Sequence, residues 1–307
     1  MQPNIINSLT IEKKALIVGA VINLVMAISG WIAFYLSNSE ALLLDGNFSF
    51  IVFLSTIVAI KISSIKSVKN ETFPFGLFIY EALYALLKGL MIIGMLLLAF
   101  TENVSKIVHF MAGGETGLLN SNVILVYSIL MTLLCFILAA YYKHQNRKMG
   151  NISSILLAEY IAAILDGFMS AGIGIALVGI TVLPPGSSLG FLNYIGDAIL
   201  VIILCLLLGK EPFILVKNSF IELVGGTLQN AEEKEKIEQL LQTNFSVNNL
   251  LLKSHISKTG SSYLIIAYLN SHQLDDLGYQ KITDMKNKIT EQLNNRYPDS
   301  LFEMVLH

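Results

Sequence analysis

Long apolar runs alternate with short polar connections through the first 210 residues of the chain. A helix needs about 20 apolar residues to cross a hydrocarbon core about 30 Å thick. Six windows meet this requirement, so we expect six membrane spans at about 15–36, 41–62, 75–100, 122–142, 152–183 and 189–208. The fifth window is the longest, which predicts a tilted span.

After Gly226 the pattern changes to one that suits a water-soluble domain, rich in Glu, Lys, Asn and Gln. Apolar positions recur first at helical spacing and then in strand-like runs around a turn-rich connection. We expect helices at 230–243 and 274–296 and strands at 250–256, 263–269 and 301–306. The order helix, strand, strand, helix, strand predicts a small α+β domain with its helices on one face of a sheet.

Composition agrees with this division into a membrane part and a soluble part. The chain has 307 residues, of which 54% are hydrophobic and 14% charged, whereas soluble domains carry about 25% charged residues. We therefore expect a membrane domain at 1–210 and a soluble domain at 211–307. The net charge of −2 gives no indication of nucleic-acid binding. Cys135 and Cys205 lie in apolar runs and are expected to pack in the core.

Charged loops predict the orientation of the chain in the membrane. Lys and Arg near spans are retained on the cytoplasmic side, and they gather before the first span and in alternate loops: Lys13, Lys14, Lys61, Lys66, Lys69, Lys143, Arg147 and Lys148. Both termini are therefore expected in the cytoplasm, which requires an even number of spans. We also expect no removable signal peptide, because no short apolar segment with a cleavage site begins the chain.

Two copies of the string Asp-Gly-x-x-Ser lie inside predicted spans, at Asp45 to Ser49 and at Asp166 to Ser170. A carboxylate inside a span costs several kcal/mol, on the order of 3, so by default it indicates an ion or substrate pathway. Glu159 lies two turns before Asp166 on the same helix face. The other interpretations are that Asp45 is a helix-start acid near the boundary and that the serines are packing residues. Counting from the span ends places Asp166 nearer in depth to Ser49 than to Asp45.

Further charged residues lie within the predicted spans, among them Glu81, Lys88 and Asp197. Lys88 needs an acidic partner, which Asp197 could supply, and Glu81 and Asp197 could serve either function or helix pairing. No predicted span contains a histidine. A site built from carboxylate and hydroxyl oxygens suits hard ions such as Mn or Mg by ligand type.

Several strings resemble the cation diffusion facilitator family of metal transporters over nearly the whole chain. They are Asn23 in the first span, the segment 39–46, the segment 73–76 followed by Glu81, and Asp166 with Ser170. The resemblance implies a membrane all-α six-helix transmembrane domain followed by a small α+β ferredoxin-like cytoplasmic domain. It also implies a homodimer that exports divalent metal ions in exchange for protons by alternating access.

The chain departs from this family at most of the usual metal ligands. The ligand pair of the second span falls at Phe48 and Val52, and that of the fifth span falls at Ala162 and Asp166, so only Asp166 is acidic. In the soluble domain the usual positions hold Asn248, Tyr268 and Tyr279, and only His307 matches.

Two hypotheses of function follow from these departures. The first is a proton-coupled exporter with a displaced metal site formed by Asp166, Asp45, Ser49 and Glu159. The second is a non-transporting membrane scaffold or subunit of the same fold. An enzyme is not expected, because the sequence has no catalytic-triad arrangement, P-loop or Rossmann-type glycine string.

Overall fold

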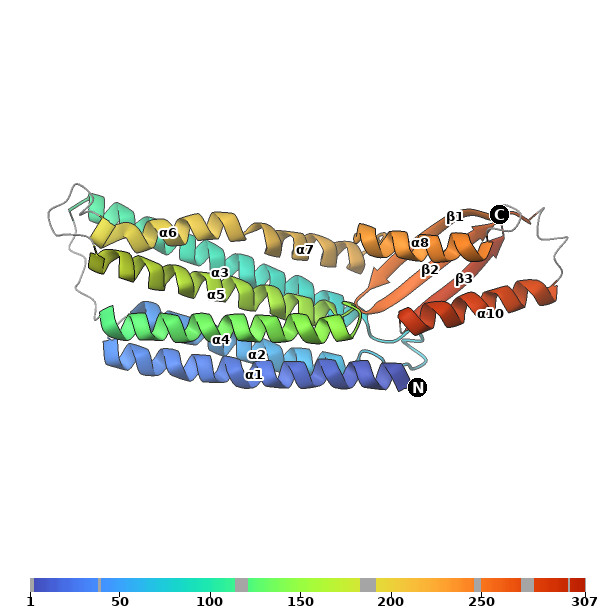
Figure 1. The fold of residues 1–307 in the computed structure, drawn as a ribbon, viewed down its shortest axis with the longest axis horizontal. Helices are drawn as coiled ribbons and strands as arrows, with labels where there is room; N and C mark the ends of the chain where they lie inside the picture. Colours follow the sequence, from blue (N-terminus) through green and yellow to red (C-terminus); the bar gives the residue numbers. More distant parts are fainter. Residues whose placement is uncertain are drawn as a thin grey trace.

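A bundle of long helices forms one end of the molecule and a small sheet domain forms the other (Figure 1). The computed structural model describes residues 3–37, 40–113, 121–182, 192–245, 250–271, 279–297 and 299–306. The bundle consists of α1 (Pro3–Ser37), α2 (Glu40–Ile65), α3 (Ile79–Met111), α4 (Ser121–Lys148), α5 (Ser154–Val182) and α6 (Leu192–Leu208).

Five of the bundle helices, α1 to α5, are long and apolar enough to cross a membrane. At 1.5 Å per residue the 35 residues of α1 extend roughly 50 Å, so this helix also projects beyond the hydrocarbon core. The described part of α6 has 17 residues. The start of the sixth predicted span falls in 183–191, outside the described residues, so a sixth crossing remains a prediction. Many outward side chains, such as Val21 and Ile32, are apolar and exposed, as a lipid-facing surface requires.

The glycines that follow the two membrane aspartates lie where helices approach most closely. A Cβ atom on Gly30 of α1 would lie 2.6 Å from the Cα atom of Gly46 on α2. A Cβ atom on Gly167 of α5 would lie 3.1 Å from Cys135 Cβ on α4. Small residues at such crossings let backbones pack tightly in membrane proteins. The two approaches place the preceding residues, Asp45 and Asp166, at the α1–α2 and α4–α5 contacts.

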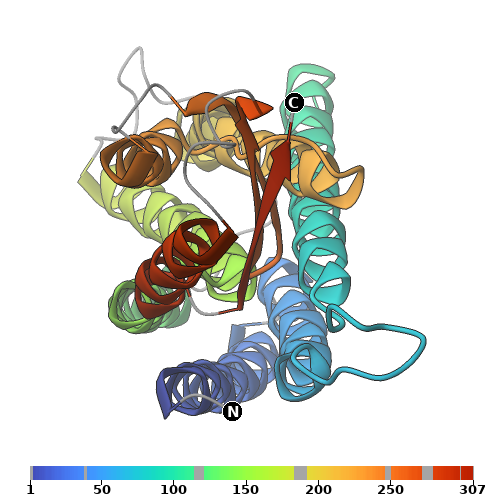
Figure 2. The ribbon, with the colours of Figure 1, turned by 90° about the vertical axis from the view of Figure 1, so that its right-hand side faces the viewer.

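The sheet domain has the element order that the sequence predicts. After α7 (Lys210–Leu223), which packs on α3, come α8 (Ala231–Phe245), β1 (Leu251–Thr259), β2 (Ser262–Leu269), α10 (Tyr279–Arg296) and β3 (Ser300–Leu306). β1 pairs with β2 antiparallel and β2 pairs with β3 parallel, in the order β1-β2-β3. Figure 2 shows α8 and α10 on the same side of the sheet. The predicted start of the last helix, at 274, lies outside the described residues.

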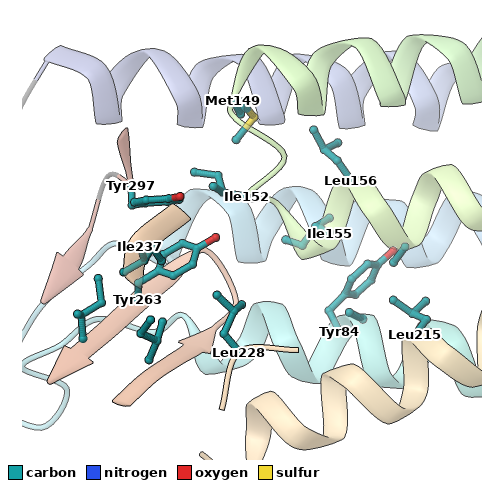
Figure 3. Close-up of a cluster of buried hydrophobic side chains, with 14 of the residues drawn as sticks. Tyr84, Met149, Ile152, Ile155, Leu156, Leu215, Leu228, Ile237, Tyr263 and Tyr297 are labelled. Carbon is teal, nitrogen blue, oxygen red and sulfur yellow. The ribbon is translucent and has the colours of Figure 1, made fainter. Parts of the chain in front are cut away.

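The two ends of the molecule share one hydrophobic cluster (Figure 3). Tyr84 of α3 and Ile155 of α5 belong to the bundle, whereas Ile237 of α8 and Tyr263 of β2 belong to the sheet domain, and all four are buried. Leu215 of α7 lies beside Tyr84 in the close-up, on the bundle side of the cluster. Burial of apolar surface at this junction therefore holds the sheet domain against the helix ends.

Candidate cation site in the membrane helices

A cavity of about 370 Å³ lies among the membrane helices and brings the predicted site residues together. Asp45 and Ser49 of α2 line it, as do Glu159, Asp166 and Ser170 of α5. The apolar residues at the usual family ligand positions also face this space: Phe48, Val52 and Ala162. All four residues expected to form a displaced site therefore border one cavity.

Both membrane aspartates receive a hydrogen bond from α4. Tyr127 Oη donates to Asp45 Oδ2, and Cys135 Sγ donates to Asp166 Oδ2 over 3.4 Å. The two donors are eight residues apart on α4, roughly 12 Å along the helix axis, which agrees with the depth difference expected from the sequence. Within the described part of the chain, no cation lies at ion-pair distance from either carboxylate. Among the described residues, these two carboxylates are therefore hydrogen-bonded but not ion-paired, and Glu102 and Lys106 also line the cavity.

Glu159 is engaged with groups of the protein. Lys88 Nζ lies 3.1 Å from Glu159 Oε1, and each side chain is 1% exposed. Tyr84 Oη donates to the same carboxylate oxygen. The packing of α3 against α5 brings Glu159 to the Lys88 ammonium, a partner that the sequence did not suggest, and the expected pairing of Lys88 with Asp197 stays a prediction. The side chain of Asp197 itself lies outside the described residues.

Glu81 lies away from the cavity, at the junction with the sheet domain. Its Oε2 atom lies 3.3 Å from Lys66 Nζ, and Lys66 Nζ lies 2.7 Å from Glu12 Oε2. The backbone N–H of Ser154 donates to Glu81 Oε1 over 3.0 Å. All three charged side chains are buried. Of the two roles considered from the sequence, these contacts favour the structural one.

The sequence reasoning missed Tyr127, Cys135 and Tyr142 as polar groups of the cavity, and it named Asn23 only for the family resemblance. Tyr127 was not singled out, and Cys135 was expected only to pack. Asn23 Nδ2 and Tyr142 Oη are buried and have no hydrogen-bond partner among the described groups. Both side chains border the cavity. The spacing of these residues in the sequence could have identified three of them. Tyr127, Cys135 and Tyr142 are seven or eight residues apart in one predicted span, which places them near one face of α4.

The donor set of the cavity is oxygen-rich but dispersed. Among the described residues, no three His, Cys, Asp or Glu side chains lie close enough together to hold a metal ion. Hard cations bind carboxylate and hydroxyl oxygens, and the cavity offers such oxygens on Asp45, Asp166 and Ser49. In the sheet domain, Asn248 and His307 lie outside the described residues, and Tyr268 stacks edge-on against His255 at 5.6 Å.

Comparison with known families connects this cavity to a class of membrane protein. The family model for the cation efflux transmembrane domain matches residues 16–224, which include every cavity residue named above. A comparison with curated proteins finds no match. The matched region covers more than half of the chain. With its apolar helices and acidic cavity, the chain belongs to the cation efflux family of integral membrane proteins, whose members transport metal cations.

Proposed function

We propose that this protein exports a divalent metal cation through the cavity, in exchange for protons. The observation that supports this most strongly is the presence of two membrane carboxylates, Asp45 and Asp166, at one cavity, with neither of them in an ion pair among the described residues. Carboxylates inside a membrane domain are costly, and by default they mark a place where an ion or a proton binds. A cation in the cavity would neutralise both carboxylates.

Exchange follows from charge balance in the cavity. One divalent cation neutralises two carboxylates, and two protons neutralise them equally well. Asp45 and Asp166 interact electrostatically across the cavity, so binding at either one changes the charge that the other meets. A carrier that alternates between a metal-loaded and a protonated form avoids moving an uncompensated charge through the membrane.

The ligands proposed here are those with an accessible oxygen. Asp166 is the principal ligand, because it occupies a usual family position and faces the cavity. Asp45 supplies the second charge, and Ser49 adds a hydroxyl oxygen one turn beyond it. Glu159 is assigned to its ion pair with Lys88 in this conformation. Oxygen ligands favour hard cations, so Mn²⁺ is the first ion to test.

Transport by alternating access requires the cavity to open to each side of the membrane in turn. We infer that the cavity sits in the middle of six spans with both termini in the cytoplasm. The cytoplasmic sheet domain, of ferredoxin-like type, joins two copies into a homodimer. The shared hydrophobic cluster supports a close mechanical link between that domain and the helices.

Transport into proteoliposomes tests the proposal. We expect a pH gradient to drive Mn²⁺ flux in the wild type, and Asp166→Asn and Asp45→Asn to reduce it at least tenfold. Glu71→Gln removes an exposed carboxylate outside the cavity and is the matched control. Wild-type flux in Asp166→Asn contradicts the site. Absence of flux for Mn²⁺, Zn²⁺, Fe²⁺, Co²⁺ and Mg²⁺ in the wild type contradicts the function.

A non-transporting scaffold is the second candidate. Its support is the apolar character of three usual ligand positions, Phe48, Val52 and Ala162, together with the dispersed donors of the cavity. This candidate predicts that no divalent ion raises the melting temperature of the membrane domain. A rise that Asp166→Ala abolishes favours the transporter, because only a ligand that binds the folded state stabilises it.

A further inference from the structure

Lys88 fills an oxygen-lined position beside the cavity. Its Nζ atom lies 3.1 Å from Glu159 Oε1 and 2.8 Å from Ser55 Oγ. The Lys88 and Glu159 side chains are almost fully enclosed. A buried ammonium requires such partners, because the desolvation of an unpaired charge costs several kcal/mol, on the order of 5. The contacts around Lys88 are therefore those that a cation of any kind would need at this position.

Ser55 and Glu159 contact the Lys88 ammonium directly. Tyr84 and Thr56 surround the Glu159 carboxylate, so three helices contribute oxygens to what we call the oxygen shell. Glu159 comes from α5, Tyr84 from α3, and Ser55 and Thr56 from α2. Tyr84 Oη donates to Glu159 Oε1, and Thr56 Oγ1 lies 3.4 Å from Glu159 Oε2. The hydroxyls of Ser55 and Thr56 also lie 2.8 and 2.9 Å from the carbonyl oxygen of Val52 and donate to it. Because their hydrogens can point to that carbonyl, the lone pairs of both hydroxyls are available to a cation.

The shell is continuous with the cavity. Glu159 and Val52 both line the cavity that contains Asp166. Glu159 precedes Asp166 by seven residues, roughly 10 Å along α5. Lys88 reaches Glu159 from α3 and is the cation that compensates it. Removal of the Lys88 charge would leave Glu159 without its ion-pair partner.

We propose that Glu159, Ser55, Thr56 and Tyr84 form a second cation site, which the Lys88 ammonium fills in this conformation. A hard metal cation occupies the site when Lys88 is withdrawn. The Lys88 ammonium thus competes with metal cations for the same oxygens, and a cation that crosses this end of the cavity must displace it. The site rests on its own contacts and does not depend on metal binding by Asp45 or Asp166.

Titration calorimetry of the purified full chain with MnCl₂ tests this site. We expect Lys88→Met to bind one Mn²⁺ more per chain than the wild type, whatever number the wild type binds. The additional ion should disappear in Lys88→Met/Glu159→Gln, which removes both charges of the pair. It should persist in Lys88→Met/Asp166→Asn. This last variant separates the second site from the proposed transport site, because failure of one leaves the other measurable.

Lys143→Met is the matched control, since Lys143 is an exposed lysine of α4 outside the cavity. It should bind the wild-type number of ions. A folded Lys88→Met that binds no additional Mn²⁺ overturns the proposal. Where Lys88→Met unfolds without metal, millimolar Mn²⁺ should restore a cooperative melt. Failure of that rescue, while Lys88→Met/Glu159→Gln folds, also overturns the proposal.

Discussion

Glu81 of α3 accepts two hydrogen bonds from Ser261, which lies 180 positions later in the chain. The backbone N–H of Ser261 donates to Glu81 Oε2 over 2.9 Å and its hydroxyl donates to the same atom over 2.8 Å. Both residues are buried. This contact joins the turn between β1 and β2 to the start of α3. Lys66 and Ser154 also donate hydrogen bonds to the Glu81 carboxylate there.

The contact predicts a specific cost for Ser261→Ala. A hydrogen bond to a charged group contributes about 1.5–3 kcal/mol, and the substitution leaves the Glu81 carboxylate with one donor fewer. We expect a loss of about that size in the free energy of unfolding, measured by denaturant titration in detergent.

Ser262→Ala is the control for this prediction. Ser262 Oγ donates to the carbonyl oxygen of Asp299 over 2.9 Å and does not reach α3. It should cost about 1 kcal/mol, the usual value for a neutral hydrogen bond. Equal costs for the two substitutions would argue against a special role for the Glu81 contact.

The free energy of unfolding should depend on pH through Glu222 of α7, which lies at the same junction and outside the candidate membrane spans. Burial raises the pKa of Glu222 from 4.5 to about 7. Two groups oppose this rise in pKa: the nearby Lys258, and the Gly260 N–H, which donates to Glu222 Oε2 over 3.0 Å. Nearby Glu81 and Glu233 raise the pKa further. The folded protein therefore holds this proton more tightly than the unfolded chain, and the stability that results is present below pH 4.5 and is lost as the pH rises through 7.

Comparison of the wild type with Glu222→Gln isolates this contribution. The amide retains an acceptor for the Gly260 N–H but has no proton to lose. Between pH 4.5 and 7 we expect the stability of the wild type relative to the variant to fall by roughly 3 kcal/mol at most, because one pKa unit corresponds to about 1.4 kcal/mol. A difference between the two melting curves that stays constant with pH would rule out this role of Glu222.

Cys135 provides a natural chemical probe of the cavity. It lines the cavity and donates to Asp166, whereas Cys205 is not among the lining residues. Methyl methanethiosulfonate adds a small group to the thiol, which would obstruct the space beside Asp166. Because Cys135 is buried and burial disfavours the reactive thiolate, we expect a slow reaction that requires the cavity to open and that Mn²⁺ slows further. Once modified, the wild type and Cys205→Ala should lose Mn²⁺ flux at least tenfold.

The Cys135→Ala variant should transport equally well with and without the reagent. Inhibition that persists in Cys135→Ala and vanishes in Cys205→Ala would place the sensitive position in α6 and away from the cavity.

Substitution of Ala162 by aspartate should raise the affinity for Mn²⁺, because Ala162 lies on the cavity wall one turn before Asp166. Residues four apart on a helix are neighbours on one face. The Ala162→Asp carboxylate would join Asp166 at the same cation, and we expect Mn²⁺ to bind at least tenfold more tightly, about 1.4 kcal/mol. Calorimetry measures this, and Ala162→Asn is the control of matched size. Unchanged affinity in both variants would indicate that the cation does not approach this turn of α5.

Periodicity was sufficient to predict the long helices and the order of elements in the sheet domain. Apolar runs have few stable alternatives in lipid, since every backbone polar group must be satisfied within the span. The glycines after Asp45 and Asp166 were expected to permit close helix approach, and Gly46 lies against Gly30. These features depend on local sequence, which explains why they were predictable.

Partner choice among the charged residues was not predictable in the same way. Lys88 pairs with Glu159 because of how α3 and α5 pack, and the linear sequence contains no direct record of that packing. The same holds for Tyr127, whose hydroxyl reaches Asp45 across 82 positions of sequence. Glu81 similarly depends on contacts with a turn of the sheet domain. Residue types identified the cavity, and tertiary packing determined which groups neutralise one another.

The most direct test of a cation in this cavity is Mn²⁺ binding to Asp166→Asn, measured by calorimetry beside the wild type and Glu71→Gln. The substitution removes one unit of charge and a ligand oxygen while nearly keeping the side-chain volume. The proposal predicts a saturable site in the wild type and in Glu71→Gln, and at least a hundredfold weaker binding in Asp166→Asn, about 2.7 kcal/mol. Equal affinity in all three proteins would contradict it.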